Sequence, residues 1–332
     1  MKVCIVEGQR QSLMPNGPDL ERNILGDGFE VNWYSVIPQT DWPCVLGEAD
    51  AVIVRPGTAF PEEMVAALRK AKVIVSLGVG FDHIDIQAAR QSGLPVCNVP
   101  DYGTEEVADS TVAMILALLR KINVLANRRV LDQWDWRLQI PIRRTRSLMA
   151  GIIGLGRIGT AVALRLKAFG MNVCFFDPYR NRGTGKALGI EQVHDADTLV
   201  QNSDIISIHA PLTPHTKAMV NARFFRLLKP DAILINTARG GIFESLDAML
   251  DALREMPRLC IGTDVLPVEP PIQHPLLQAF ADREEWLAER LLICPHAAFY
   301  SEQACEEMRR SAATIVWHVL SGNEPYNVVN GE

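Results

Sequence analysis

The sequence has no apolar run long enough to cross a membrane. A membrane-spanning helix needs about 18 or more predominantly apolar residues, and no stretch of the 332 residues reaches that length. The opening segment, Lys2 to Glu7, has the pattern of a strand and is too short for the apolar centre of a secretory signal. These absences predict a cytoplasmic protein that makes no use of a membrane.

Paired cysteines and metal-binding patterns are also missing. None of the seven cysteines forms Cys-x-x-Cys, and most lie in apolar runs. Scattered cysteines of this kind are typical of buried free thiols in a reducing compartment. The seven histidines show no His-Glu-x-x-His spacing, so no metal is expected.

Positive charge is scarce as well. The chain carries 33 lysines and arginines against 39 acidic residues, a net charge of −6. It therefore lacks the basic stripe that a nucleic-acid surface needs, and the one basic cluster, residues 143–146, is interpreted as a solvated linker. A Gly-x-Ser-x-Gly elbow and a P-loop are also missing, which argues against a serine hydrolase and a nucleotide triphosphatase.

What the sequence does contain is a regular alternation of short apolar runs and amphipathic segments. Its length favours about two domains, and the alternation predicts an α/β fold with parallel sheets covered on both faces. In the first hundred residues we predict strands at 3–6, 31–34, 51–54, 73–76 and 95–98, and helices at 61–70 and 86–92. From residue 148 we predict six strands, at 148–153, 173–176, 205–209, 232–236, 260–265 and 291–294.

A glycine-rich turn follows the strand at 148–153. Gly154 permits a tight turn, Gly156 lets the backbone approach a pyrophosphate, and Gly159 lets the next helix pack closely on the strand. After the strand at 172–176, Asp177 is placed to accept hydrogen bonds from ribose hydroxyls. This order predicts a dinucleotide with its pyrophosphate at a helix N-terminus. The alternative is a glycine turn without a ligand.

Three residues with complementary chemistry follow successive strands of the second half. Arg239 offers a planar fork that matches a carboxylate and can polarise a carbonyl. His296 can give a proton in reduction and take one in oxidation, because the reference pKa of histidine is about 6.5. Glu269 would orient the imidazole and favour its protonated form. Singly, each could be structural. Since ligands bind at the carboxyl ends of strands in such folds, together they predict reduction of a 2-oxo acid by a nicotinamide dinucleotide.

The longest predicted helix spans residues 104–121. Its first turns are acidic and it ends in Arg120 and Lys121, which suits the helix dipole. Its wide apolar stripe fits either a crossover packed between domains or a subunit interface, and periodicity does not separate the two. Trp134 and Trp136 suggest packing across such an interface. Residues 301–320 form a last predicted helix, and residues 278–290 a charged helical insertion.

Several stretches resemble the NAD-dependent D-2-hydroxyacid dehydrogenase family and, within it, the branch of the C-terminal binding proteins (CtBP). They are residues 78–85, 97–100, 105–110, 151–159, 176–179, 236–241 and 295–304, within a likeness running from about residue 73 to 320. The resemblance implies a Rossmann doubly wound cofactor domain at 100–299. It also implies a smaller flavodoxin-like substrate domain from 1–99 plus 300–332, with residues 104–121 as crossover and dimer helix.

The same resemblance assigns functional residues. It implies Arg239, Glu269 and His296 as the catalytic set. It implies cofactor contacts from Gly154, Gly156, Arg157, Ile158, Gly159, Asp177, Ala210, Pro211, Thr216, Thr237, Ala238 and Asp264. It implies that Arg239 and His296 also contact substrate, while backbone N–H groups of Gly78, Val79 and Gly80 take the substrate carboxylate from the other domain. Because family members are usually homodimers, we expect a homodimer that binds NAD and a small 2-oxo or 2-hydroxy acid.

Two positions near the expected substrate depart from the animal CtBP pattern. Phe299 stands where that pattern has Trp, and Ser76 stands where it has Arg, so the preferred 2-oxo acid stays open. Two functions are therefore considered. The first is a reversible D-2-hydroxyacid dehydrogenase, for which Asp177 favours NAD over NADP by repelling a 2′-phosphate. The second is an NADH-gated dimeric binding module of the corepressor type with little turnover. The intact Arg239, Glu269 and His296 favour the enzyme.

Overall fold

The chain folds into two compact units. The computed structural model describes residues 1–8, 17–35, 37–127 and 142–331. Unit 1 comprises Met1–Gly103 and Tyr300–Glu332, and unit 2 comprises Thr104–Phe299. The sequence prediction placed the first division after residue 99, whereas the structure begins unit 2 at the long helix α5 (Thr104–Arg120). The predicted role of Trp134 and Trp136 lies outside the described residues.

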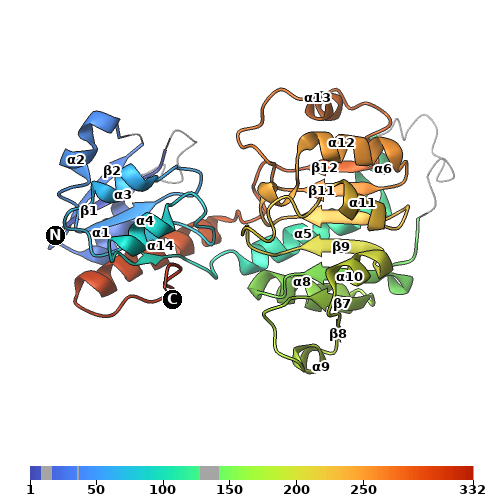
Figure 1. The fold of residues 1–332 in the computed structure, drawn as a ribbon, viewed down its shortest axis with the longest axis horizontal. Coiled ribbons are helices and arrows are strands. Elements are labelled where there is room, and N and C mark those ends of the chain that lie inside the picture. The colour runs from blue at the N-terminus through green and yellow to red at the C-terminus, as the bar shows by residue number, and fades with distance from the viewer. Residues whose placement is uncertain (9–16, 36, 128–141, 332) are drawn as a thin grey trace. The chain divides into compact units, whose positions relative to one another are not determined.

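Unit 1 contains the N-terminal strands, which are blue in Figure 1. They form a five-stranded parallel sheet in the order β2-β1-β3-β4-β5. This is the flavodoxin-like order, as predicted. The interior strand β1 is buried from Val3 to Val6 because helices cover both faces. The strands are β1 (Lys2–Val6), β2 (Glu30–Tyr34), β3 (Ala51–Val54), β4 (Ile74–Ser76) and β5 (Val96–Cys97).

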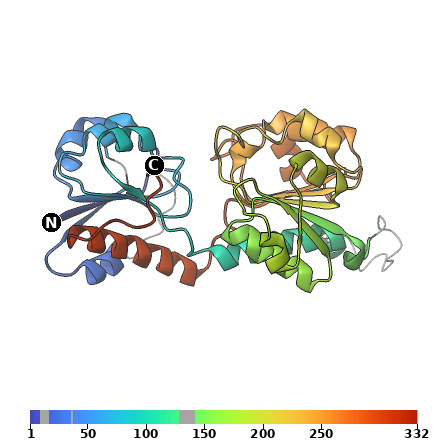
Figure 2. The ribbon, with the colours of Figure 1, turned by 60° about the horizontal axis from the view of Figure 1, so that its bottom comes forward.

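The helices of unit 1 lie in two layers, one on each face of its sheet (Figure 2). One layer holds α1 (Asp19–Leu25) and α14 (Glu302–Leu320), and the other holds α2 (Trp42–Val45), α3 (Glu62–Ala66) and α4 (Ile86–Gln91). A 3₁₀ turn, η1 (Gln39–Asp41), precedes α2. The sequence predicted α4 and α14, and it predicted α3 four residues too long, to residue 70 instead of Ala66. It did not predict α1 or α2, which are short and have no side-chain cap.

A buried ion pair ties the two segments of unit 1 together. Arg309 on α14 donates from Nε and Nη2 to the two carboxylate oxygens of Glu21 on α1, each at 2.7 Å. The Glu21 and Arg309 side chains are only 2% and 13% exposed. A bidentate pair of this kind fixes both the distance and the plane of its partners. It therefore sets how the C-terminal helix docks beside α1.

Unit 2 is built on a seven-stranded parallel sheet in the order β12-β11-β10-β9-β6-β7-β8. This doubly wound arrangement confirms the predicted Rossmann architecture. The sequence prediction of six strands was one short, because the missed strand is two polar residues long. The strands are β6 (Met149–Ile153), β7 (Asn172–Phe176), β8 (Glu191–Gln192), β9 (Ile205–Ile208), β10 (Ile233–Asn236), β11 (Cys260–Thr263) and β12 (Leu291–Ile293).

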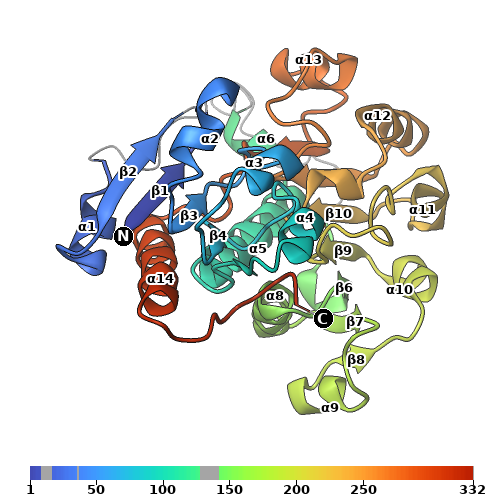
Figure 3. The ribbon, with the colours of Figure 1, turned by 60° about the vertical axis from the view of Figure 1, so that its left-hand side comes forward.

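Helices cover both faces of this sheet too. On one face α5 and α8 (Arg157–Ala168) lie side by side (Figure 3). The other face packs against α10 (Ala196–Asn202), α11 (Ala222–Leu227), α12 (Leu246–Glu255) and α13 (Pro275–Ala281). The remaining elements in the described residues of unit 2 are α6 (Ile122–Asn127), α9 (Thr184–Leu188), η3 (Thr145–Ser147) and η4 (Gly240–Ile242). The apolar stripe of α5 is thus used within unit 2, and a dimer role for this helix stays a prediction.

Of three further local predictions, one was wrong and two hold only in part. The predicted helix at 278–290 is helical only to Ala281, and Arg283 has a φ of 54°, which cannot continue a helix. Four of the seven cysteines, Cys4, Cys97, Cys174 and Cys260, are buried free thiols as predicted, whereas Cys44 is exposed. The basic cluster is not simply a solvated linker, because Arg143 pairs with Asp204 at 3.0 Å.

Among the described helices, none combines the length and the apolar character required to cross a membrane. The longest, α14, carries charged residues along its exposed side.

The Glu21–Arg309 pair yields a stability prediction. Arg309→Met should lower the free energy of unfolding by about 3–5 kcal/mol, because it leaves a buried carboxylate without its partner. The double variant Glu21→Leu/Arg309→Met should recover part of that loss. Urea unfolding of the full chain, followed by circular dichroism, measures both.

The neighbouring arginine supplies the control. Arg310 pairs with Glu306 at the surface, where the side chains are 53% and 60% exposed, so Arg310→Met should cost less than about 1 kcal/mol. A loss for Arg309→Met no larger than that of Arg310→Met would show that the buried pair does not stabilise unit 1.

Candidate active site

The glycine turn between β6 and α8 needs glycine for two different packing reasons. Gly154 has a φ of 90°, and a Cβ there would lie 2.8 Å from the backbone nitrogen of Ala210. A Cβ on Gly159 would overlap the carbonyl oxygen of Gly154. Gly156 differs, because no atom lies within 4 Å of the place its Cβ would take. Since Gly156 is the N-cap of α8, this open space leaves room for an anion at the helix N-terminus.

Asp177 follows β7 and faces this turn. Its Oδ2 accepts a hydrogen bond from the Leu155 N–H at 2.8 Å, and its Oδ1 accepts one from the Tyr179 N–H at 2.9 Å. Arg180 lies alongside, with its Nε 3.8 Å from Asp177 Oδ2 and donating to the Leu155 carbonyl at 2.7 Å. The Asp177 carboxylate is therefore fixed beside the glycine turn, and the Arg180 guanidinium lies close to it. Both groups fit the ribose end of a dinucleotide.

The loop after β9 forms the other side of the glycine turn. His209 contributes Nε2 to a 2.8 Å hydrogen bond with the Ser207 hydroxyl, and burial lowers the pKa of His209 to about 3. Its imidazole is thus neutral at physiological pH. Beyond it, the Thr216 hydroxyl donates to the Pro211 carbonyl at 2.5 Å and shapes the loop. The predicted cofactor residues Ala210, Pro211 and Thr216 all lie here.

A buried amide holds the turn that carries Arg239. Asn236, at the end of β10, donates from Nδ2 to the Arg239 carbonyl at 2.9 Å and accepts from the Ala238 N–H at 3.0 Å. Arg239 Nη1 in turn donates to the Ala238 carbonyl at 2.8 Å. Thr237 shares a 2.8 Å hydrogen bond with the Thr111 hydroxyl of α5. The predicted residues 237–239 therefore form one ordered turn.

Glu269 and His296 form the hydrogen bond predicted for them. His296 Nδ1 and Glu269 Oε2 are 2.8 Å apart, and the other oxygen of Glu269 accepts the Leu266 N–H at 2.9 Å. An ionised carboxylate only accepts hydrogen bonds, so the shared proton lies on Nδ1 of the imidazole. The second ring nitrogen, Nε2, is then the one that can exchange a proton with a ligand. The His296 side chain is 34% exposed, so solvent and ligands can reach it.

Asp264 fixes the backbone around His296. Its carboxylate, 2% exposed, accepts the N–H groups of Ala297 and Ala298 at 2.8 and 2.9 Å, and its carbonyl accepts the His296 N–H at 2.7 Å. Burial raises the pKa of the Asp264 carboxyl, while the two N–H bonds act in the opposite direction. These bonds hold His296 at a φ of 56°, a conformation that is costly for a residue other than glycine.

The sequence interpretation missed several supporting residues. Ser110 on α5 donates to the Ala298 carbonyl at 3.1 Å, and Asn236 and Ser207 hold the turns described above. A polar residue within or at the end of a buried strand is a signal that could have identified Ser207 and Asn236. No such signal marks Ser110, because its partner lies 188 residues away.

The other residues predicted to contact cofactor or substrate lie at the start of α8 and in the loop after β4. Arg157 and Ile158 begin α8 behind the glycine turn. Gly78, Val79 and Gly80 belong to unit 1 and follow β4. Gly78 has a φ of 154°, and a Cβ there would lie 3.0 Å from the Pro56 ring.

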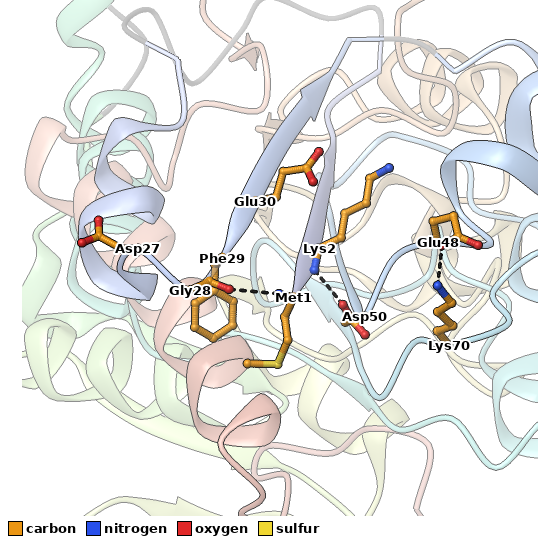
Figure 4. A pocket seen from close by; sticks show the side chains of 9 residues that line it. All are labelled: Met1, Lys2, Asp27, Gly28, Phe29, Glu30, Glu48, Asp50 and Lys70. Atoms are coloured by element: carbon orange, nitrogen blue, oxygen red, sulfur yellow. Dashed lines mark hydrogen bonds and ion pairs between the residues drawn. The ribbon is translucent and has the colours of Figure 1, made fainter.

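A pocket of about 600 Å³ in unit 1 lies elsewhere (Figure 4). It lies at the amino ends of β1 and β2, and its lining includes the charged residues Lys2, Glu30 and Asp50 as well as Met1 and Phe29. The Lys2 N–H donates to Asp50 at 2.6 Å. Ligands of open α/β sheets bind at the opposite, carboxyl ends of the strands. This pocket is therefore separate from the candidate residues of unit 1.

The lowered pKa of His209 predicts a pH dependence of stability. The unfolded histidine titrates near 6.5, so the contribution of the neutral folded imidazole is fully present above that pH. It is lost as the pH falls from about 6.5 towards 3. His209→Gln should therefore flatten the acid side of the stability profile by up to about 1.4 kcal/mol per pH unit.

Urea unfolding at pH 4, 5 and 6 measures this difference. His194→Gln, at an exposed position, is the matched control and should follow the wild type. Parallel profiles for wild type and His209→Gln would show that His209 does not titrate differently on unfolding.

The chain is similar in sequence to proteins of known activity. It is 35% identical over 285 residues to the D-3-phosphoglycerate dehydrogenase of Methanocaldococcus jannaschii, which covers 86% of this chain and 52% of the relative. The chain thus spans about half the length of the curated relatives it matches. This similarity does not distinguish the CtBP branch, which stays a prediction.

Solved structures match nearly the whole chain. The D-lactate dehydrogenase of Aquifex aeolicus, solved with NAD and lactic acid, has a TM-score of 0.84 at 27% identity, with 99% of each chain covered. An acyclic imino acid reductase solved with NADPH and D-Arg has a TM-score of 0.80 at 27% identity, covering 99% of this chain and 100% of the other.

The family model named "D-isomer specific 2-hydroxyacid dehydrogenase, NAD binding domain" matches residues 112–298. This match covers more than half of the chain. It includes the glycine turn, Asp177, Arg239, Glu269 and His296. The chain therefore belongs to the D-isomer specific 2-hydroxyacid dehydrogenase family, and residues 112–298 are its NAD-binding domain.

Proposed function

We propose that this protein is a D-2-hydroxyacid dehydrogenase that reversibly reduces a small 2-oxo acid. The observation that carries the proposal is the Glu269–His296 hydrogen bond of 2.8 Å at the carboxyl end of the NAD-binding sheet. A protein that only binds NADH has no need of a histidine oriented by a carboxylate. The pair provides what reduction of a carbonyl needs beside the hydride, namely a proton donor with a defined direction.

The direction of proton transfer follows from the hydrogen bonds of Glu269. Because Leu266 and His296 Nδ1 occupy its two oxygens, Glu269 stays an acceptor and keeps the Nδ1 proton in place. Protonated Nε2 of His296 gives its proton to the carbonyl oxygen in reduction. Neutral Nε2 takes the hydroxyl proton in oxidation. The negative charge of Glu269 stabilises the imidazolium form.

Arg239 supports the same reaction through the substrate. Its guanidinium is held on the turn that Asn236 fixes, three residues beyond β10. A planar guanidinium can bind a carboxylate and also polarise a neighbouring carbonyl. We assign it both roles toward the 2-oxo acid. When bound, NADH supplies the hydride that becomes the hydrogen on carbon 2.

The relatives indicate the substrate class. D-3-phosphoglycerate and D-lactate dehydrogenases, by name, act on 2-hydroxy acids. Small aliphatic, aromatic and phosphorylated 2-oxo acids are therefore the panel to assay, following NADH absorbance. A lack of NADH oxidation across the panel, with tight NADH binding retained, would reject the dehydrogenase and favour an NADH-gated binding module.

The catalytic set is tested by substitution. His296→Gln should lower kcat by about a hundredfold or more, because it removes the general acid and base. Glu269→Gln should also lower kcat, since the amide no longer stabilises the imidazolium. Both variants should retain the wild-type Kd for NADH in fluorescence titrations. His194→Gln, at the surface, is the control, and unchanged turnover in His296→Gln would reject the assignment.

The choice between NADH and NADPH depends on Asp177 and Arg180. The wild type should prefer NADH, because the fixed Asp177 carboxylate repels a 2′-phosphate. Asp177→Ser should shift the ratio of kcat/KM values toward NADPH by at least about tenfold, since Arg180 can then pair with the phosphate. Adding Arg180→Gln should remove that gain. A wild-type preference for NADPH would contradict this account of Asp177.

A further inference from the structure

The loop after β4 is held by its carbonyl groups. The Gly78 carbonyl accepts the Val99 N–H at 3.0 Å, and the Gly78 N–H donates to the Ser76 carbonyl at 2.9 Å. The first of these bonds attaches the start of the loop to the segment after β5, and the second closes a turn at the end of β4. The two carbonyls that follow are held by side chains instead.

Two buried side chains complete the attachment. Asn98 donates from Nδ2 to the Val79 carbonyl at 2.7 Å, and the Ser76 hydroxyl donates to the Gly80 carbonyl at 2.6 Å. Asn98 is 8% exposed and Ser76 is fully buried. All three carbonyls of loop 78–80 therefore point inward.

Anchored carbonyls fix the opposite side of each peptide. In a trans peptide the C=O and the N–H of the next residue point in opposite directions. The inward carbonyls of residues 78, 79 and 80 therefore turn the N–H groups of Val79, Gly80 and Phe81 outward. Within the described residues, these three N–H groups donate to no acceptor of the protein. Successive N–H groups of this kind form a concavity that binds anions.

The C-terminal tail holds Asn98 in turn. The Asn98 N–H donates to the Asn327 carbonyl at 3.1 Å, and the Val329 N–H donates to the Val96 carbonyl at 2.8 Å. Asn330 adds two side-chain bonds, accepting the Val96 N–H at 2.8 Å and donating to the Leu94 carbonyl at 2.9 Å. The tail thus runs along the edge strand β5 and limits the movement of Asn98.

We propose that Ser76 and Asn98 are positioning residues for the substrate carboxylate. Asn98 orients the Gly80 N–H and Ser76 orients the Phe81 N–H, which together with the Val79 N–H bind the carboxylate of the 2-oxo acid. The inference rests on the proposed function for the identity of the anion. It adds a third backbone donor, the Phe81 N–H. It also gives the Ser76 hydroxyl a role, which is to hold the Gly80 carbonyl.

Removing either anchor should weaken carboxylate binding and leave chemistry intact. Ser76→Ala and Asn98→Ala should each raise KM for the 2-oxo acid about tenfold, equivalent to the loss of one hydrogen bond of about 1.4 kcal/mol. We expect kcat within about twofold of wild type, because the carboxylate is bound alike in ground and transition states. Ser76→Thr, which keeps the hydroxyl, should restore most of the affinity.

The matched control is Ser203→Ala. Ser203 is equally buried, and its hydroxyl donates to the carbonyl of Leu199, also four residues away. It lies in unit 2 before β9, at the amino end of the sheet. The control should leave KM unchanged. All variants should keep the wild-type Kd for NADH.

Binding of oxalate in the presence of NAD, measured by calorimetry, separates this inference from the proposed function. If the wild type binds oxalate but reduces no 2-oxo acid, the proposed dehydrogenase activity is rejected. The oxalate Kd values of the variants then still test whether Ser76 and Asn98 position the loop. Oxalate or 2-oxo acid affinities of Ser76→Ala equal to those of Ser203→Ala would overturn the inference. So would absence of oxalate binding and turnover in the wild type. If Asn98→Ala does not fold, the oxalate and 2-oxo acid affinities of Ser76→Ala alone test the inference.

Discussion

The constraint on which the structure depends is that all strands of each sheet run parallel. A parallel sheet collects the carboxyl ends of its strands at one edge, and in unit 2 the register places Asn236, Thr263 and Ile293 side by side at the ends of β10, β11 and β12. Arg239 and His296 each follow one of these strand ends by three residues. Segments far apart in the sequence are therefore brought to the same end of the sheet.

Buried polar side chains then orient the loops that emerge at that edge. Asp264 accepts two N–H groups beside His296, and Asn236 holds the turn of Arg239. In unit 1, Asn98 and Ser76 hold loop 78–80 by its carbonyls. A buried side chain of this kind must be satisfied, and once satisfied it specifies one backbone conformation. Both units therefore use the same physical means to orient the loops that follow their strands.

Regular structure was predictable from the sequence because its causes are local. Alternation of apolar and amphipathic segments located every strand of both sheets except β8, whose two residues, Glu191 and Gln192, are polar. Strand-end position also identified the Glu269–His296 pair. Contacts between distant segments could not be predicted this way. The Glu21–Arg309 pair joins residues 288 positions apart, and nothing in either neighbourhood indicates its partner.

The central claim is that the residues at this edge direct a hydride and a proton onto a 2-oxo acid. The most direct measurement uses NADH carrying deuterium at the transferring position of the nicotinamide ring, with the best 2-oxo acid from the panel. The account predicts a 2-hydroxy acid of D configuration with one deuterium on carbon 2, detected by NMR and chiral chromatography. A product without the label, or of L configuration, would contradict it.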